Sequence, residues 1–452
     1  MTVRDAVRTA WEAGPGRALH AAGWRSANPR VGNLGSVTAV SQLPPRTRLA
    51  CRLGLLAAWA SRRLGRHGGM IGGRVALAAD PDALARLAAG RSIALVSGTN
   101  GKSTTTTLLA TALGGAVDAV ATNIGGANMP DGLVSALLER PTAPRAVLEV
   151  DEPYLPRVLM ACRPAVVVLL NLTRDQLDRV GETRQLAERI RQALDDRPDA
   201  VVVANVEDPL VVWAAQRARR QVWVAAGTGW TGDSTQCPAC GGVLVRDTGT
   251  WSCSCGLRRP TPDWELHGEQ VRVPDGRRAR LVLGLPGRMN ASNAVHALAA
   301  ADAMGMPWPD ALPLLSDVRQ VHGRYRTVAV GGHRVRMLLA KNPAGWQEML
   351  DLLAGSRGGL VLALNAREAD GRDPSWIWDV PVEALATRTL VAAGERAADV
   401  SVRLTYAGLP HVVAPDPVAG VQALPDGPVD LVADYTAFRG AAHQLRRAPD
   451  VR

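Results

Sequence analysis

The sequence LVSGTNGKSTTTT at residues 95–107 decides the fold class, because it places a glycine-rich turn between two regular elements. The run SIALVS (92–97) before it is typical of a buried strand, and the stretch after Gly101 is typical of a helix. Such a turn directs backbone N–H groups and the positive end of the helix dipole at an anion. The pattern predicts a phosphate-binding loop in an α/β fold.

A single lysine lies in this loop. The chain has 52 lysines and arginines, of which only Lys102 and Lys341 are lysines, leaving 50 arginines. We therefore expect each lysine to mark a place that needs a compact ammonium group. We expect Lys102 to contact the β- and γ-phosphates of ATP and Ser103 to give its hydroxyl to Mg²⁺. Val96 stands where the common GxxxxGK[ST] pattern has its first glycine, so the alternative is a chance glycine-rich turn.

Acidic residues end the apolar run AVLEVDEP (146–153). Mg²⁺ at a phosphate loop needs a carboxylate from the end of a neighbouring strand. Glu149, Asp151 and Glu152 are the candidates, and the alternative is that they are solvated acids at a strand end. Glu149 is our first choice, since it falls inside the apolar run, where a charge needs a partner.

Apolar runs alternate with helical stretches along most of the chain, which favours a parallel sheet covered on both faces. The first set of runs lies at 145–150, 165–172, 199–205 and 221–227, with a helix such as 182–196 between two of them. A strand, a turn and a long helix are expected within 280–305, and further helices at 51–66 and 81–90. The second set lies at 335–340, 359–366, 388–394 and 430–438.

This alternation predicts an α/β protein of two domains. We expect a central ATP-binding domain with a parallel sheet at 51–318 and a smaller Rossmann-like α/β domain at 319–452. Residues 1–50 are poorly patterned and are expected to form an extension.

The net charge is +10, with an isoelectric point of about 10.0. It indicates either a solvated arginine-rich surface or an anionic partner such as a nucleotide, a phospholipid headgroup or a membrane face. Nucleic acid is disfavoured, because no arginine cluster is interleaved with stacking aromatic residues. We find no signal peptide, and LGLLAAWA (53–60) is too short to span a membrane, so we expect a cytoplasmic protein without a transmembrane segment.

Four of the six cysteines, Cys237, Cys240, Cys253 and Cys255, lie in an insert at 233–262. Two close pairs separated by twelve residues are typical of a structural Zn²⁺ site, and four thiolates leave no open coordination position for catalysis. The alternatives are free thiols on a loop and a zinc ribbon that reads DNA. The other two cysteines are expected in the core.

Several motifs in order resemble the Mur ligase family of ATP-dependent amide-forming enzymes, over roughly residues 50–440. They are GTNGKST (98–104), LEV (148–150), NLTRDQLDR (171–179), NVEDPL (205–210), GRMNASNAVHALAA (287–300) and HGR (322–324). Within that family the chain is most similar to the MurT branch, which the cysteine insert, LLAKNPAGW (338–346) and ADGRDPSWIWDV (369–380) support.

The resemblance implies a set of ATP-site residues. They are Gly98, Thr99, Asn100, Gly101, Lys102, Ser103 and Thr104 in the loop, Glu149 for magnesium, Asn290 and Asn293 near the adenine, and Arg324 at the nucleotide. Gln176 departs from the family, which has His there. Only about 90 residues precede the loop, too few for a domain that grips a UDP sugar, so the expected substrate is lipid-linked.

The resemblance also implies a reaction, the ATP-dependent amidation of the D-glutamate α-carboxyl of lipid II to D-isoglutamine through an acyl phosphate. The ammonia would come from a GatD-like glutamine amidotransferase in a heterodimer at the inner face of the plasma membrane, because this chain has no glutaminase cysteine motif of its own. The alternatives are a stand-alone Mur-type amino-acid ligase and a nucleotide-binding scaffold without chemistry.

Family partners lack the acid of their Cys–His pair, so an aspartate of this chain is expected to orient the partner's His. The motif ADGRDPSWIWDV offers Asp370, Asp373 and Asp379, of which we choose Asp379 first and Asp373 second. The alternative is that they are ordinary loop acids. We expect Lys341 to neutralise the substrate carboxylate or the acyl phosphate, the alternative being a role in packing.

Overall fold

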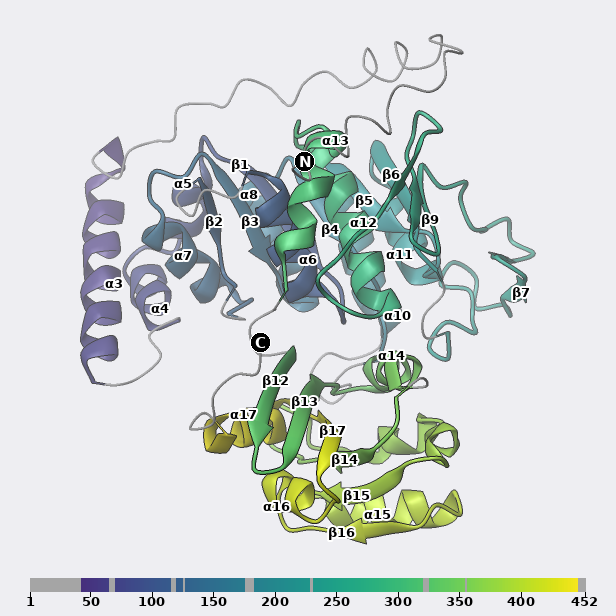
Figure 1. The fold of residues 1–452 in the computed structure, drawn as a ribbon. Coiled ribbons are helices and arrows are strands. Elements are labelled where there is room, and N and C mark those ends of the chain that lie inside the picture. Colours follow the sequence, from purple (N-terminus) through teal and green to yellow (C-terminus); the bar gives the residue numbers. More distant parts are fainter. Residues whose placement is uncertain are drawn as a thin grey trace, which may run out of the picture.

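The computed structural model describes residues 42–64, 70–114, 119–124, 127–174, 183–227, 231–319, 325–353 and 356–445. Within these ranges the chain forms a nine-stranded and a six-stranded sheet, each covered by helices (Figure 1), and a two-stranded ribbon of β7 (Val245–Asp247) and β8 (Thr250–Ser252). The α/β class and the parallel sheets are as the sequence predicts.

The larger sheet contains β1 (Ser92–Ser97), β2 (Val120–Thr122), β3 (Arg145–Glu149), β4 (Val166–Leu169), β5 (Val201–Asn205), β6 (Arg220–Ala225), β9 (Trp264–His267), β10 (Gln270–Arg272) and β11 (Arg278–Arg280). Their order is β11-β10-β9-β6-β5-β4-β1-β3-β2. The strands from β2 to β9 are parallel, and β10 and β11 add an antiparallel edge. The strands near β1 are Val-, Leu- and Ala-rich because they are buried on both faces.

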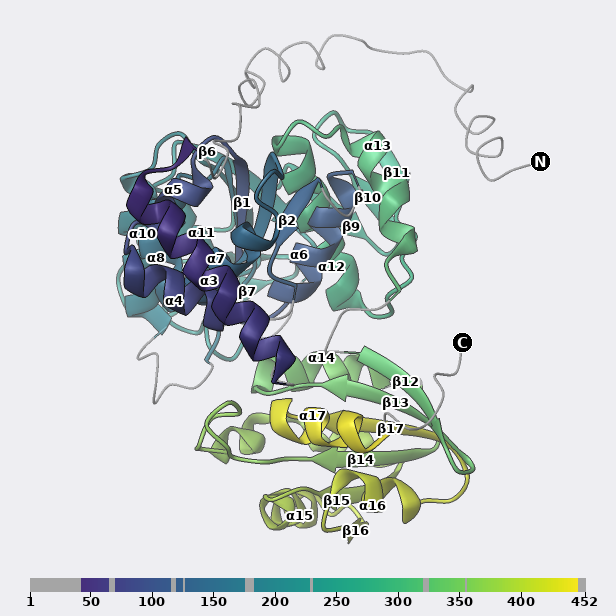
Figure 2. The same cartoon turned by 90° about the vertical axis from the view of Figure 1, so that its left-hand side faces the viewer.

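Helices cover both faces of this sheet. Two long helices, α6 (Lys102–Ala112) and α12 (Arg288–Ala303), share one core cluster with it. The opposite face is covered by α5 (Ala83–Ala88), α7 (Pro130–Glu139), α8 (Leu155–Cys162), α10 (Thr183–Asp195) and α11 (Pro209–Ala215). Outside α7 lie α4 (Ile71–Ala79) and then α3 (Pro45–Arg63), the outermost helix of Figures 1 and 2.

The smaller sheet contains β12 (Tyr325–Val330), β13 (His333–Leu339), β14 (Gly359–Ala363), β15 (Thr389–Ala393), β16 (His411–Val413) and β17 (Gly427–Ala433). Their order is β12-β13-β17-β14-β15-β16, with only β12 antiparallel. One face packs on α14 (Pro343–Leu353) and α15 (Ala397–Tyr406), the other on α16 (Pro417–Gln422) and α17 (Tyr435–Gln444). In Figure 1, α14 lies between this sheet and the larger one.

Three predicted elements differ from the structure. The run after 280 forms no strand, because Leu281 and Leu285 enter the core while the chain turns toward α12. The run 430–438 is split at Asp434, whose carboxylate caps α17 by accepting from the Ala437 N–H, so that only its first part is strand. The helix expected at 51–66 is α3, which begins at Pro45, since proline fits the first turn of a helix.

Candidate functional site

The predicted phosphate loop joins the end of β1 to the start of α6. Gly101 has φ +88° and Gly98 has φ +141°, values that favour glycine. A Cβ at position 101 would lie 2.4 Å from Asn293 Oδ1, and one at position 98 would lie 2.9 Å from Leu170 Cβ. Glycine is therefore required at both positions by conformation and by space, and the loop brings α12 against the start of α6.

Residues after β4 hold this loop in place. The Thr99 N–H donates to the Asn171 carbonyl at 2.9 Å, and the Asn100 N–H donates to Asn171 Oδ1 at 2.8 Å. Asn171 Nδ2 donates back to the Asn100 carbonyl at 3.0 Å, and the Thr173 N–H donates to Thr99 Oγ1 at 3.0 Å. Backbone and side-chain groups of the loop are thus fixed from the carboxyl end of the neighbouring strand.

Lys102 is the first residue of α6 and only 3% exposed. Its Nζ lies 3.0 Å from Glu152 Oε2 and 3.4 Å from Asp151 Oδ1. Burial alone would lower the pKa of this ammonium, but Glu152, Asp151 and Glu149 raise it above its ordinary value. Burial would raise the pKa of the Glu152 carboxyl, but Lys102 holds it below its usual range. The site therefore keeps a buried, fully charged ammonium beside carboxylates.

Glu149 ends β3 beside this lysine and is 2% exposed. Its Oε1 accepts from Asn128 Nδ2 at 3.4 Å, and its Oε2 is buried without a hydrogen-bond partner among the described residues. A buried carboxylate oxygen without a partner costs free energy unless something else meets it. A hard divalent cation such as Mg²⁺ is the kind of group that fits, because it prefers oxygen ligands. Ser103 and Thr104, also buried, lie in the first turn of α6.

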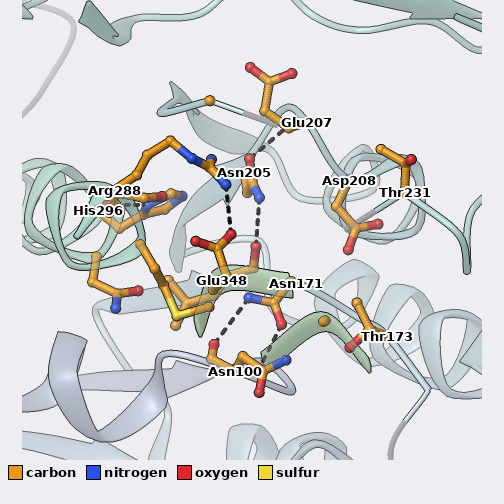
Figure 3. Close-up of a pocket in the computed structure, with 16 residues that line it drawn as sticks. Asn100, Asn171, Thr173, Asn205, Glu207, Asp208, Thr231, Arg288, His296 and Glu348 are labelled. Carbon is orange, nitrogen blue, oxygen red and sulfur yellow. Dashed lines mark hydrogen bonds and ion pairs between the residues drawn. The ribbon is translucent and has the colours of Figure 1, made fainter. Parts of the chain in front are cut away.

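A pocket opens at the carboxyl ends of β4 and β5 (Figure 3). The pocket is lined by elements that surround the larger sheet and by α14, which packs on the smaller sheet. Its residues are Asn100, Leu170, Asn171, Thr173, Asn205, Glu207, Asp208, Gly227, Thr231, Arg288, Met289, Ser292, Asn293, His296, Ala344 and Glu348. Ligands of open α/β sheets bind outside the carboxyl ends of the strands, close to the point where the strand order reverses, which in this sheet lies beside β1.

Helix α12 supplies buried polar atoms to the pocket. Asn293 Nδ2 and His296 Nε2 are buried without partners in the described part of the chain, while His296 Nδ1 hydrogen-bonds the Ser292 carbonyl at 2.8 Å. Burial lowers the pKa of His296 to about 4, so the imidazole is neutral at pH 7. Asn290 is not among the lining residues and instead donates to the Pro286 carbonyl at 2.6 Å. The two predicted asparagines are thus placed differently.

Helix α14 completes one wall, and the turn before it contacts the phosphate loop. Asn100 and Asn342 exchange amide hydrogen bonds of 3.2 and 3.3 Å, and Arg288 Nη2 lies 2.7 Å from Glu348 Oε1. Burial raises the pKa of the Asp151 carboxyl. Lys341, which precedes Asn342, is close enough to that carboxyl for its charge to oppose this rise. The structure therefore brings the second lysine of the chain to the cluster around the first one.

The three aspartates of 369–380 have different surroundings. Asp370 is buried and accepts from the Thr436 N–H at 2.8 Å, whereas Asp373 is exposed and accepts from the Ser375 N–H at 2.9 Å. Asp379 Oδ2 lies 3.0 Å from Arg174 Nη2, and its side chain is 41% exposed. Asp379 thus reaches the larger sheet's side of the molecule, which the other two do not.

Two tryptophans, Trp376 and Trp378, precede Asp379 and differ in their burial. Trp376 packs toward the core against Trp346, with ring centroids 6.3 Å apart. Trp378 is 49% exposed and makes an edge contact with Tyr406 at 5.4 Å. One ring anchors the segment and the other remains at the surface.

The four predicted cysteines lie together, with their Sγ atoms all within 4.8 Å of one another. Cys237 Sγ and Cys255 Sγ are 3.6 Å apart, and Cys240 Sγ and Cys253 Sγ are 3.5 Å apart. Thiolates bound to one tetrahedral Zn²⁺ would be about 3.8 Å apart, given Zn–S bonds of roughly 2.3 Å. The donor set therefore fits a zinc ion.

The insert is tied to the pocket wall. Trp251 Nε1 donates to the Val206 carbonyl at 2.8 Å, and Arg259 contacts the Glu207 carboxylate at 2.8 and 3.1 Å. Glu207 lines the pocket, so a change in the structure of the insert would alter the position of a pocket residue.

Two residues singled out in the sequence, Arg324 and Gln176, lie outside the described residues. Sequence reasoning did not single out Arg288, His296 or Glu348. Arg288 and His296 fall within the motif at 287–300, so that motif could have indicated them as site residues. Glu348 comes from α14 and had no local signal.

Comparison with known proteins agrees with this geometry. Residues 96–301 match the Mur ligase middle domain, and residues 339–438 match the MurT ligase C-terminal domain. The chain is 32% identical over 401 residues to the MurT subunit of lipid II isoglutaminyl synthase (glutamine-hydrolyzing) from Streptococcus pneumoniae, covering 80% of this chain and 88% of the relative.

The chain belongs to the MurT family of Mur ligases. A MurT subunit from Staphylococcus aureus is 29% identical, covering 88% of this chain and 98% of the relative. Like these MurT relatives, the chain is a ligase-type enzyme subunit.

Solved structures show the shared fold. A pseudomurein peptide ligase type C from Methanothermus fervidus matches with a TM-score of 0.61 at 17% identity, covering 77% of each chain. MurF ligase from Thermotoga maritima in complex with ADP matches with a TM-score of 0.57 at 18% identity, covering 79% of this chain and 81% of that one. In the part of the chain that the structure describes, no helix is both long and apolar enough to cross a membrane.

Proposed function

We propose that this chain amidates the D-glutamate α-carboxyl of lipid II to D-isoglutamine, using ATP and using ammonia from a GatD-like glutamine amidotransferase. The observation that carries the proposal is the buried Lys102 ammonium at a glycine-rich strand-to-helix loop. Beside it lies a Glu149 oxygen to which no described residue donates a hydrogen bond. The names of the MurT relatives supply the substrate class.

The loop residues 98–104 bind the triphosphate of ATP. Lys102 neutralises charge on the terminal phosphates, and the N–H groups at the start of α6 face them. Glu149 and Ser103 hold Mg²⁺, which supplies further neutralisation of phosphate charge when it is bound. We assign Asn293, on α12 beside Gly101, to the nucleoside, and we assign Arg324 and Asn290 to the nucleotide only through the family pattern.

The reaction has two steps. A carboxylate oxygen of the substrate attacks the γ-phosphorus of ATP, the bond to the β,γ-bridging oxygen breaks, and ADP leaves. Ammonia then attacks the acyl carbon, the acyl C–O bond breaks, phosphate leaves with the former carboxylate oxygen, and the ammonium product loses a proton to give the amide. Lys341 comes from the second sheet to the Asp151 side of the cluster, where it neutralises the carboxylate or the acyl phosphate.

Ammonia must be delivered, because ammonium predominates at neutral pH. Asp379 is our candidate for the acid that orients the partner's His, with Asp373 second, and its exposed edge is available to a second chain. Trp378, Tyr406 and Val402 form an exposed apolar cluster nearby, 49%, 78% and 47% exposed. Aromatic side chains of this kind favour the centre of a protein interface.

Residues 51–318 form the ATP-binding domain and residues 319–452 the MurT-type domain in this proposal, after the extension at 1–50. The insert at 233–262 is a zinc ribbon that holds a structural Zn²⁺ through Cys237, Cys240, Cys253 and Cys255. The enzyme works on the cytoplasmic side of the plasma membrane, where ATP and glutamine are present.

The test is ATP hydrolysis and lipid II amidation, each measured with and without a GatD-like partner and glutamine. The proposal expects amidation that depends on ATP, glutamine and partner together. Turnover that needs an amino acid but no partner would instead identify a stand-alone ligase. Absence of any ATP turnover under all conditions would identify a scaffold.

A further inference from the structure

Helix α3 has an unusual distribution of apolar residues. Its inward face carries small residues, since Ala50, Cys51, Gly54 and Ala58 are the buried apolar positions. Its outward face carries the large ones. Leu49, Leu53, Leu56 and Trp59 are 58%, 40%, 61% and 55% exposed. A helix that only covers a domain buries its large apolar residues instead, so the outward face has a separate purpose.

The small residues fix α3 firmly against α4. A Cβ at Gly54 would lie 2.5 Å from the Gly72 carbonyl oxygen, and one at Gly72 would lie 2.9 Å from the Gly54 carbonyl oxygen. The two backbones are therefore in close contact, and the helix cannot rotate to bury its leucines. Helix α4 in turn packs on α7, so α3 is a rigid ridge on the body of the protein (Figure 2).

Arginines accompany the exposed leucines. Helix α3 contains five arginines and no acidic residue, and Arg52 and Arg63 lie among the exposed apolar side chains. Arg63 stacks on the Trp59 ring at 5.3 Å. Arg62, on the edge of this face, approaches Glu139 at 3.9 Å. We call Leu49, Arg52, Leu53, Leu56, Trp59 and Arg63 the α3 outer face.

We propose that the α3 outer face binds the surface of an anionic lipid bilayer. A helix with leucines and tryptophan beside arginines, and without acidic residues, lies in the plane of a membrane interface. Its arginines reach the phosphates while its leucines and Trp59 enter the acyl boundary. A flat bilayer suits a convex ridge, and arginines without an acidic residue on the same helix complement the negative charge of anionic headgroups.

The link to catalysis rests on the proposed function. A lipid-linked substrate has its headgroup at the membrane surface, and the carboxyl-terminal end of α3 points toward the side of the molecule that carries the second sheet (Figures 1 and 2). Docking through α3 would hold the enzyme at the membrane without burying the cleft between the sheets.

The experiment is vesicle flotation of the full-length chain, alone and with its glutaminase partner. The probes are phosphatidylcholine vesicles and phosphatidylcholine vesicles that contain phosphatidylglycerol. We expect binding to the anionic vesicles, weakened by salt, and a loss of about tenfold or more in the double variant Leu56→Ser/Trp59→Ser. The matched control is Met160→Ser/Val282→Ser, which alters side chains that are 47% and 57% exposed elsewhere. It should float like wild type.

Three results would overturn the proposal. The first is failure of the wild-type chain to float, and the second is equal flotation of the Leu56→Ser/Trp59→Ser variant. The third is a variant that loses its complex with the glutaminase or changes its oligomeric state, because the face would then be a protein interface.

Activity separates this proposal from the proposed function. The variant should amidate detergent-solubilised lipid II normally and vesicle-embedded lipid II poorly. If wild type fails even in detergent, the proposed function is wrong while flotation still decides the role of α3.

Discussion

Arg174 Nη2 and Asp379 Oδ2 lie 3.0 Å apart and join the two halves of the molecule across the cleft. Both side chains are about two-fifths exposed, so this ion pair contributes no more than about 1 kcal/mol to stability. Arg174 is also held by Asp233, the first residue of the cysteine insert. The acid that we assign to the partner's glutaminase site is thus already in contact with the ATP-binding side.

Asp379→Asn should therefore lower glutamine hydrolysis by the partner about hundredfold or more, since a triad His loses its orientation without the carboxylate. ATP binding should be unchanged. The control is Arg174→Gln, which breaks the same ion pair without removing the acid. If Arg174→Gln lowers glutaminase activity as much as Asp379→Asn, the carboxylate acts only through the ion pair.

Lys102→Ala should lower amidation about 10²- to 10³-fold, because the charge on the terminal phosphates is no longer neutralised. Glutamine hydrolysis by the partner should remain measurable. Lys102→Arg should fail as well, since the planar guanidinium does not fit a buried position 3.0 Å from Glu152. Near-normal turnover of Lys102→Arg would contradict the role given to the compact ammonium.

Stability needs a separate control at this position. Lys102→Ala leaves the buried Glu152 carboxylate unpaired, at a cost of about 3 kcal/mol or more. The double variant Lys102→Met/Glu152→Gln removes both charges, so its thermal midpoint should recover while its amidation stays lost. Recovery of activity along with stability would show that Lys102 is structural.

Glu149→Gln should raise the Mg²⁺ concentration needed for half-maximal ATP turnover about tenfold or more, because a neutral amide is a weaker ligand than a carboxylate. The atom concerned is Oε2, which has no hydrogen-bond partner within the ranges that the structure describes. The exposed Glu139→Gln serves as control. An unchanged Mg²⁺ dependence would mean that Asp151 or Glu152, and not Glu149, is the metal ligand.

Cys237→Ser should lower the zinc content of the purified chain, as measured by mass spectrometry, and lower its thermal midpoint. ATP affinity should also fall, because Arg259 and Trp251 connect the insert to the pocket wall. Cys162→Ala, which changes a buried cysteine in α8, should keep its zinc. Full ATP affinity in a zinc-depleted Cys237→Ser protein would show that the insert does not affect ATP binding.

Stability below pH 7 should depend on His296. Its pKa is about 4 in the folded chain and about 6.5 when unfolded, so unfolding takes up a proton between these values. Stability is therefore lost as the pH falls from 6.5 toward 4, by about 3 kcal/mol from this group. NMR of labelled histidine should show one imidazole neutral at pH 5 that is absent in His296→Gln. Titration of that signal near 6.5 would contradict its burial.

The local part of the site could be predicted from the sequence. A strand, a glycine turn and a helix are adjacent in the chain, so the loop around Lys102 follows from short-range pattern alone. The Cys237–Cys255 cluster is likewise contained in one segment. Both depend on spacing, which a single sequence records.

The contacts between the two sheets could not be predicted. Asn100 and Asn342 are 242 residues apart, and the pairing of their amides depends on how the two sheets pack. The inward face of α3 is a similar case, since both faces carry apolar residues and only the glycine contact with α4 decides between them.

The central claim is that ATP activates a carboxylate of lipid II through an acyl phosphate. The most direct test is to label the D-glutamate α-carboxylate of lipid II with ¹⁸O and to analyse the phosphate released during amidation with ATP, glutamine and the partner. With both carboxylate oxygens labelled, the account predicts one labelled oxygen in phosphate for each amide formed. Amide formation with unlabelled phosphate would contradict it.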